Sequence, residues 1–268
     1  MRTLILGLFL FFLNQVSFSK GKSVVLYKGI DEYEIGSYVD ILEDKSNKLA
    51  LKNIQDPRNE HLFKQNKSKG IKFGPHTSTY WLRIKTRKED GSGLWYLSFS
   101  TSKIDHLTFY RNSTDKSTTG LKYSLKSREV MGRFFVFKMD VESVSTFYIK
   151  VKNDGVKLPS VKLKILSPSE YKKKDTISEV GNTLYLGILL AMFLYNLLIV
   201  VETKSLTDLS YAGWLFFFTL SASYRTGLGQ LYLFPDSFFF RSNLVYYLNL
   251  CHMSLFSLFA YRFLEINK

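Results

Sequence analysis

The chain has 268 residues, of which 46% are hydrophobic and 16% aromatic, and its formal net charge is +14. Residues 20–176 contain 31 Lys+Arg and 18 Asp+Glu, a net charge of +13, whereas residues 177–268 contain five of each kind and are otherwise mostly apolar. This division excludes a single soluble globular domain, and the aromatic content excludes disorder as the main state. The single cysteine, Cys251, excludes an intramolecular disulfide framework and a cysteine-based metal cluster.

The first 19 residues have the pattern of a secretory signal peptide. Arg2 gives a positive start, residues 4–13 are apolar, and Ser17 and Ser19 supply small residues at a cleavage site before Lys20. The apolar stretch is too short to span a bilayer comfortably. We therefore expect the following domain to be exported, whether this segment is cleaved or stays as an anchor.

Residues 20–170 are predicted to form an extracytoplasmic all-β domain, a sandwich or jelly roll. Five segments alternate apolar and polar residues, which is typical of strands with one buried face, and residues 104–110 are a further β-rich run. No helix is predicted before residue 170. The residues expected to face the core are Tyr80, Leu82 and Ile84; Trp95, Leu97 and Phe99; Phe135, Phe137, Met139 and Val141; Phe147, Ile149 and Val151; and Val161, Leu163 and Ile165.

Three charge-free windows, at residues 180–201, 209–224 and 242–261, predict a membrane region over residues 180–268. A spanning helix needs roughly 20 mostly apolar residues, so the first and third windows qualify alone, and the apolar run after Arg225 extends the second. We expect three transmembrane helices near 181–201, 208–226 and 242–263, after a linker at 171–179. Buried helices of a soluble protein are disfavoured because no amphipathic helix remains to cover them. Export of the β-domain then implies the cytoplasmic (inner) membrane, with the N-terminal domain in the periplasm and the C-terminus in the cytoplasm.

Motifs in both halves of the chain indicate a known receptor family. The β-half contains ILED (41–44), YWLRI (80–84), DHLTFY (105–110) and FYIKV (147–151). The matching positions in the membrane half are Gly187, Tyr195, Asn196, Tyr211, Gly227, Gly229, Phe234, Pro235, Phe263 and Leu264. In these features the chain resembles the bacterial seven-transmembrane receptors with diverse intracellular signalling modules. The resemblance implies that the β-half is the second type of extracellular domain of that family, a jelly roll related to carbohydrate-binding modules.

Members of that family continue with four more helices and a cytoplasmic output domain, such as a histidine kinase, a diguanylate cyclase or a phosphatase. The present sequence stops seven residues after Tyr261, so we expect a receptor truncated after the third helix, without an output domain and without enzymatic activity. Three functions stay open. The chain is the sensor half of a receptor, alone or with a separately encoded signalling module; a membrane-anchored carbohydrate-binding or attachment protein; or a non-functional fragment.

Four residues of the β-domain are candidates for ligand binding. Trp81 and Arg83 share the strand face opposite the expected core, so an indole and a guanidinium would project together from the outer face, and Tyr110 with Arg111 would form a similar pair. Aromatic rings stack on sugars, and arginine bonds hydroxyl, carboxylate or phosphate groups. The alternative is structural, with Trp81 covering the sheet edge and Arg83 paired to an acid.

The basic exported domain favours anionic partners, either a polysaccharide, another anionic small molecule or the lipid bilayer. Nucleic acid is not expected outside the cytoplasm, and no cofactor or metal site is predicted, since the histidines lack metal-ligand spacing. In the membrane region the resemblance assigns packing or signalling roles to Gly187, Tyr195, Asn196, Gly227 and Gly229. Asn196, Asn249 and His252 are polar residues of the apolar windows, which usually face other helices and hydrogen-bond to them.

Overall fold

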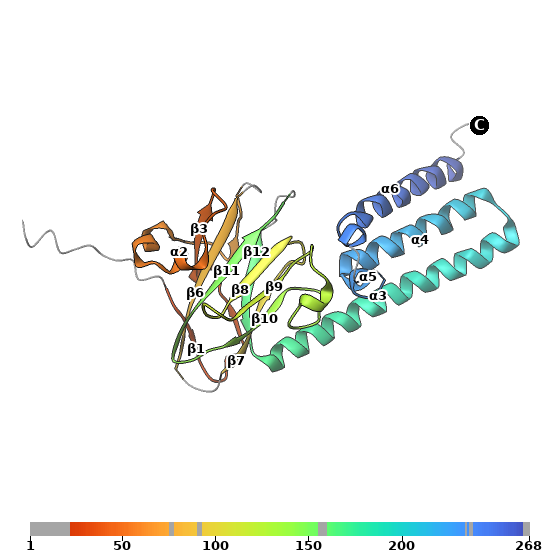
Figure 1. Ribbon diagram of the computed structural model, residues 1–268. Helices are drawn as coiled ribbons and strands as arrows, with labels where there is room; N and C mark the ends of the chain where they lie inside the picture. Colours follow the sequence, from red (N-terminus) through yellow and green to blue (C-terminus); the bar gives the residue numbers. More distant parts are fainter. Residues whose placement is uncertain are drawn as a thin grey trace, which may run out of the picture.

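The computed structural model describes residues 22–74, 78–89, 93–154, 160–233, 235 and 238–264. It contains a β-sandwich-like domain followed by a helical region that extends away from it (Figure 1). The all-β class predicted for the N-terminal domain is confirmed. The predicted signal peptide, residues 1–19, lies outside the described residues.

The first sheet is built around strand β6, Thr79–Lys88. This strand lies between β3, Val39–Asp44, and β11, Val144–Lys152, and is antiparallel to both. The last residues of β6 also pair in parallel with β1, Val24–Leu26. The sheet is completed by β4 (Lys64–Gln65) beside β3 and by β8 (His106–Tyr110) and β9 (Lys116–Thr119) beyond β11.

The second sheet faces the first and is wholly antiparallel over its described strands. Its order is β10 (Val136–Asp140), β7 (Leu94–Phe99), β12 (Val161–Leu166) and β2 (Glu32–Glu34), and β5 (Gly70–Ile71) also pairs with β12. Strand β12 is the last strand of the domain and lies between β7 and β2. The strand that leads into the helical region is therefore hydrogen-bonded on both sides.

The core lies between the two sheets and is formed by the residues that the alternation predicts. All of the predicted core-facing residues are buried except Trp95, which is partly buried and packs against the core. Aromatic rings join the layers, because Phe109 of β8 stacks on Phe137 of β10 and on Phe147 of β11, with ring centroids 5.1 and 5.6 Å apart. Stacked and edge-on rings of this kind stabilise beyond the apolar area that they bury.

The prediction that no helix precedes residue 170 is wrong. A short helix α2, Leu51–Gln55, is followed at once by the 3-10 helix η2, Pro57–Leu62, and two further 3-10 turns are η1, Gly36–Tyr38, and η3, Leu125–Ser127. The start of η2 has a clear local cause. The Asp56 side chain accepts a hydrogen bond from the Arg58 amide, and Pro57 occupies the first position of the helix, where its missing N–H is not needed.

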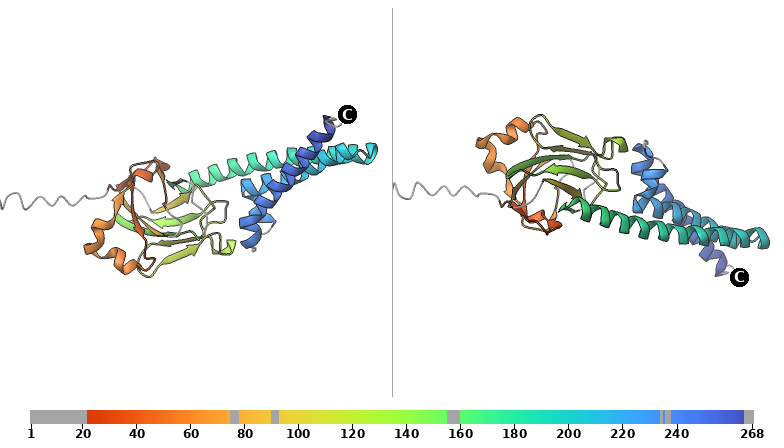
Figure 2. Two further views of the ribbon diagram at one scale, coloured as in Figure 1. Left: turned by 90° about the horizontal axis from the view of Figure 1, so that it is seen from above. Right: turned by 90° about the horizontal axis from the view of Figure 1, so that it is seen from below.

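The helical region contains α3 (Pro168–Thr203), α4 (Leu206–Thr226), the short α5 (Leu228–Tyr232) and α6 (Phe238–Phe263). The long helices run alternately away from the β-domain, back towards it and away again (Figures 1 and 2). Ser167 caps α3 by accepting from the Glu170 amide. Residues 171–179, expected as a linker, are therefore the first turns of a continuous helix that begins directly after β12.

Two of the described helices, α3 and α6 over Asn243–Phe263, are long and apolar enough to cross a membrane. Only 6% and 11% of their apolar windows are buried, so they are not the core helices of a soluble protein, whose apolar residues would be covered. The helix α4 does not meet the same criterion, although it packs against both neighbours. Crossing by all three predicted helices therefore stays a prediction.

Candidate functional site

Trp81 and Arg83 do not project from an open face. Trp81 is fully buried and Arg83 is 7% exposed, so the expectation of an exposed platform is wrong. The segment 49–63, which contains α2 and η2, covers this face of the first sheet. It packs an outer cluster that consists of Leu42, Ile54 and Trp81 with Leu49, Leu51, Phe63, Tyr110 and Tyr148.

The Trp81 ring has an aromatic neighbour and a cationic neighbour. Tyr110 stacks on it with a centroid separation of 5.7 Å, and the Lys150 ammonium nitrogen lies 5.5 Å from its centroid. Burial raises the pKa of the phenols of Tyr110 and Tyr148, as expected for rings removed from water. The indole Nε1 is buried and has no hydrogen-bond partner among the described residues. Its surroundings are therefore those of a packing residue.

Arg83 forms a buried ion pair that ties β6 to β3 and to the covering segment. Its Nη2 lies 2.9 Å from Oδ2 of Asp40, and its Nη1 lies 3.3 Å from Oε1 of Glu60. The guanidinium carbon is 4.3 Å from the centroid of the Phe63 ring. The alternative that Arg83 pairs with an acid is thus confirmed, while Trp81 lies on a central strand rather than at a sheet edge.

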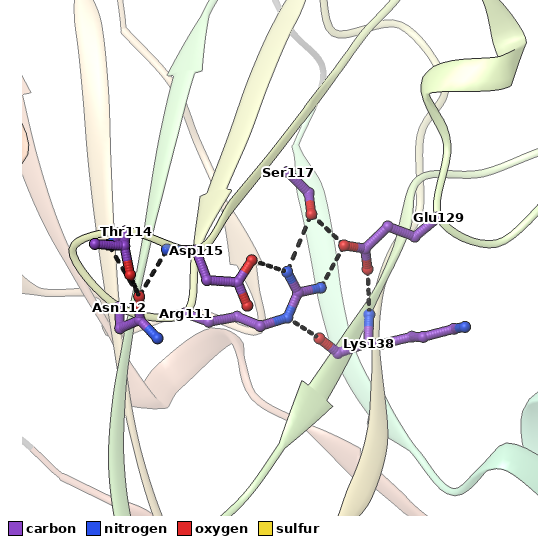
Figure 3. Close-up of polar contacts among 7 residues, drawn as sticks. All are labelled: Arg111, Asn112, Thr114, Asp115, Ser117, Glu129 and Lys138. Atoms are coloured by element: carbon purple, nitrogen blue, oxygen red, sulfur yellow. Dashed lines mark hydrogen bonds and ion pairs between the residues drawn. The ribbon is translucent and has the colours of Figure 1, made fainter.

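Tyr110 and Arg111 do not act as a pair, because their side chains join different networks. Tyr110 belongs to the outer cluster, whereas Arg111 bonds to the loop that precedes β10 (Figure 3). The Arg111 guanidinium donates to the Lys138 carbonyl at 2.9 Å, to Asp115 at 3.3 Å, to Ser117 at 3.0 Å and to Glu129. A guanidinium engaged by four partners ties strands together and has little capacity left for a ligand.

Glu129 is the central acceptor of this network. Burial alone would raise the pKa of its carboxyl, but hydrogen bonds from Ser117, from the Lys138 amide and from Arg111 outweigh burial and lower it. The carboxylate therefore stabilises the folded state above its ordinary pKa of 4.5, and this contribution is lost as the pH falls through the lowered value.

Replacing Glu129 by glutamine is expected to reduce the free energy of unfolding at neutral pH by about 2 kcal/mol, since hydrogen bonds to the charged group are lost. The variant should also lose less stability than the parent when the pH is lowered from about 5 to 3. Urea unfolding of the full chain in dodecyl maltoside, followed by tryptophan fluorescence, measures both. Asp115→Asn is the matched control, because its carboxylate is 52% exposed and such pairs contribute little. Equal effects of the two variants would contradict the prediction.

The described residues show a second arrangement that the sequence did not reveal, at the junction of the β-domain with the helices. Arg133, in the loop before β10, donates from Nη1 to the Thr226 carbonyl at 3.2 Å and from Nη2 to Oγ of Ser178 at 2.5 Å. Gly227 ends α4 with φ +83°, and a Cβ there would lie 3.2 Å from Cβ and Cγ of Arg133. Glycine thus provides both the left-handed backbone and the room for the arginine stem.

The start of α3 makes a second contact with the β-domain. The Tyr171 ring packs edge-on against Tyr96 of β7, with centroids 5.3 Å apart, and its hydroxyl lies 2.9 Å from where a Cβ of Gly132 would be. The junction therefore includes the loop before β10, strand β7 and the adjoining ends of α3 and α4. No periodic pattern marks Arg133, and only the resemblance pointed to Gly227.

Of the other candidate residues in the membrane region, one is closely packed by its neighbours and the others are not. Gly229 is packed, because a Cβ there would lie 2.7 Å from Oγ of Ser223. Gly187 has open space around it, and Tyr195 is 65% exposed. In the described part of the chain, Asn196 bonds to the Met192 carbonyl of its own helix and not to another helix. Roles of these three residues in packing or signalling stay predictions.

Asn249 fulfils the expectation for a polar residue between helices. Its Oδ1, on α6, accepts from Oγ of Ser221 at 2.6 Å and from Nη2 of Arg225 at 3.0 Å, both on α4. Nε2 of His252 lies 3.3 Å from the same oxygen. One amide oxygen therefore joins α4 to α6.

Replacing Asn249 by leucine is expected to lower the free energy of helix association by about 0.6–1.7 kcal/mol, the range for hydrogen bonds between membrane helices. Titration of the full chain with SDS in mixed micelles, followed by circular dichroism, measures the loss. Asn196→Leu is the control and should have a smaller effect, since among the described residues the Asn196 side chain bonds within its own helix. A loss as large in the control would show that Asn249 does not join the helices in this way.

Within the part of the chain that the structure describes, no group of three or more His, Cys, Asp or Glu residues is placed to hold a metal ion.

Two family models match the chain, one in the β-domain and one in the helical region. The family model 7TMR-DISM extracellular 2 matches residues 36–164, and the model 7TM diverse intracellular signalling matches residues 179–268. A search of curated proteins finds no match to the chain. The first match spans most of the β-sandwich, and the second begins within α3 and includes α4 and α6. The chain therefore belongs to the 7TMR-DISM family of receptor-like proteins and is a membrane protein with an extracellular N-terminal domain.

Proposed function

We propose that the protein is a non-catalytic membrane sensor. Its extracellular domain binds a ligand, and this binding changes the arrangement of its helices. The observation that supports this proposal is the set of contacts between the β-domain and the helices at the junction. Strand β12 continues through Ser167 into α3, Tyr171 packs on Tyr96, and Arg133 bonds to α3 and α4. A change in the packing of the sandwich would therefore displace helix ends, and an inert tether would not need these contacts.

The favoured ligand class is a carbohydrate, and the basic surface of the domain favours an acidic one. The proposal places the protein in the cytoplasmic membrane, with the sandwich in the periplasm, three membrane crossings and the C-terminal end in the cytoplasm. Its further partner would be a separately encoded signalling module. The second candidate is a membrane-anchored attachment protein, which would use the same domain without moving the helices.

Hydrogen–deuterium exchange separates these functions. The full chain in nanodiscs would be titrated with an oligogalacturonate, as the acidic glycan, and with maltohexaose, as the neutral one. A sensor should show slowed exchange in the sandwich together with altered exchange in residues 168–182 and 223–233. Altered exchange confined to the sandwich would favour the attachment protein, and no binding of either glycan would contradict the carbohydrate proposal.

The proposed topology has its own test. An alkaline phosphatase fusion at Lys268 should be inactive, and a fusion at Ser167, on the periplasmic side of α3, should be active. Activity at Lys268 would overturn the three-crossing arrangement.

A further inference from the structure

A cavity of about 310 Å³ lies where the β-domain meets the helices. Its lining includes Arg133 and Phe134 from the loop before β10, Ser178 and Asn182 from α3, and Arg225 from α4. The volume is at the lower end of the range for small-molecule sites. Three segments that are distant in the sequence thus line a partly open space that could hold a small ligand or the polar head of a larger one.

The two arginines give this junction cavity a positive character. Neither Arg133 nor Arg225 forms an ion pair with a carboxylate of the described residues, whereas Arg83 and Arg111 each pair with two. Asp175 is near enough for the charge of Arg133 to lower the pKa of its carboxyl, although burial and the charge of Glu179 outweigh this and raise it. Asp175 and Arg133 form no ion pair within the described structure. Neither guanidinium is therefore neutralised by an ion pair within the described residues.

Both guanidinium groups keep donors for a further acceptor. Each arginine has five N–H donors. In the described structure Arg133 bonds to the Thr226 carbonyl and to Ser178, and Arg225 bonds to Asn249. A planar guanidinium matches the oxygens of a phosphate in a bidentate manner, and the Ser178 hydroxyl adds a neutral donor beside it.

The position of the cavity along the helices also suits a phosphate. The charge-free stretch of α3 begins at Val180, between the lining residues Ser178 and Asn182. On α4 the lining residues Arg225 and Thr226 lie at the end of the helix that is nearest the β-domain (Figure 1). The cavity is thus at the boundary between the apolar helices and the extracellular domain, where lipid headgroups lie and where soluble solutes also have access.

We propose that the junction cavity binds a phosphate group between Arg133 of the β-domain and Arg225 of α4. The phosphate belongs either to the headgroup of an outer-leaflet lipid or to a soluble phosphate ester. Because Arg225 also bonds to Asn249, a bound phosphate would link the β-domain, α4 and α6 through one anion. This binding does not depend on the proposed sensor function, since an attachment protein would contain the same cavity.

Native mass spectrometry of the full chain in dodecyl maltoside, a detergent without phosphate, tests the proposal. The probes are phosphatidylglycerol for the lipid source and glycerol 3-phosphate for the soluble source. Arg133→Gln and Arg225→Gln should each weaken binding of the favoured probe by about tenfold, the effect of losing one charge-assisted contact. Arg133→Lys keeps the charge without the planar group and should have a smaller effect.

The control is the double variant Lys172→Gln, Lys173→Gln, which removes exposed positive charge from the same end of α3 without touching the cavity. A tenfold loss for phosphatidylglycerol in both arginine variants supports a lipid ligand, and the same loss for glycerol 3-phosphate supports a soluble one. If neither probe loses more affinity in the arginine variants than in the lysine control, the proposal is overturned. Should Arg133→Gln fail to fold, Arg225→Gln and Arg133→Lys decide the question.

Discussion

Replacing Asp40 by alanine is expected to lower the free energy of unfolding of the β-domain by about 3–5 kcal/mol, because it leaves Arg83 buried without its main partner. The side chains of Arg83 and Asp40 are 8% and 6% exposed, and their charged atoms lie 2.9 Å apart. Glu60 remains 3.3 Å away, but its side chain is 38% exposed, so water already solvates that carboxylate and weakens its attraction. Urea unfolding of the full chain in detergent measures the loss.

Two further variants define the origin of this loss. Glu89→Ala removes the partner of Arg87 in an exposed pair at 2.8 Å, and its effect should stay below about 1 kcal/mol. Asp40→Leu combined with Arg83→Met removes both buried charges and should recover much of the stability that Asp40→Ala loses. If Asp40→Ala lowers the free energy of unfolding no more than Glu89→Ala does, the Arg83–Asp40 pair is hydrated in solution. The segment 49–63 would then not be closed over it.

The strands of the sandwich could be predicted from the sequence because each has one buried and one outer face. The alternation at Phe135, Phe137, Met139 and Val141 reports on contacts that each strand makes with the common core, and all four residues are buried. The same alternation identifies the opposite face without saying whether another segment covers it. The error at Trp81 therefore came from treating the outer face as open.

The covering segment did carry a local signal. Leu51 and Ile54 are three apart, as on one face of a helix, and Asp56-Pro57 has the residues preferred at a helix start. At five residues α2 is too short for periodicity to identify, since an isolated helix of that length is not stable without tertiary contacts. Its stability comes from packing on Trp81 and Leu42, which no local pattern shows.

The beginning of α3 shows the difference between a helix and its membrane-spanning part. Hydropathy detects the apolar stretch from Val180, whereas the helix begins at Pro168 with a capping Ser167 and an acidic Glu170 in its first turn. The junction could not be predicted at all, because Arg133 and Thr226 are 93 positions apart and neither belongs to a repeated pattern. Only the fold brings them together.

Trp81→Ala is expected to lower the free energy of unfolding by about 3–5 kcal/mol, because it leaves a large cavity under the covering segment. Trp81→Phe should cost less than about 1.5 kcal/mol. Phenylalanine retains most of the apolar contact, and no hydrogen bond is lost, since the indole nitrogen has no partner among the described residues. Tyr27→Ala, at a ring that is 43% exposed, is the control and should change stability by about 0.5 kcal/mol or less.

The same variants decide whether Trp81 contacts a ligand. For a glycan to stack on the indole, the segment 49–63 would have to leave the sheet, so binding would be coupled to exposure of Leu42 and Ile54. In Trp81→Ala a loss of glycan affinity would have two causes, the missing ring and the weakened domain. Trp81→Phe keeps an aromatic face and most of the stability, so a large loss of affinity in that variant would indicate a direct contact. A stability cost of Trp81→Ala no greater than that of Tyr27→Ala would instead mean that the indole is open to solvent.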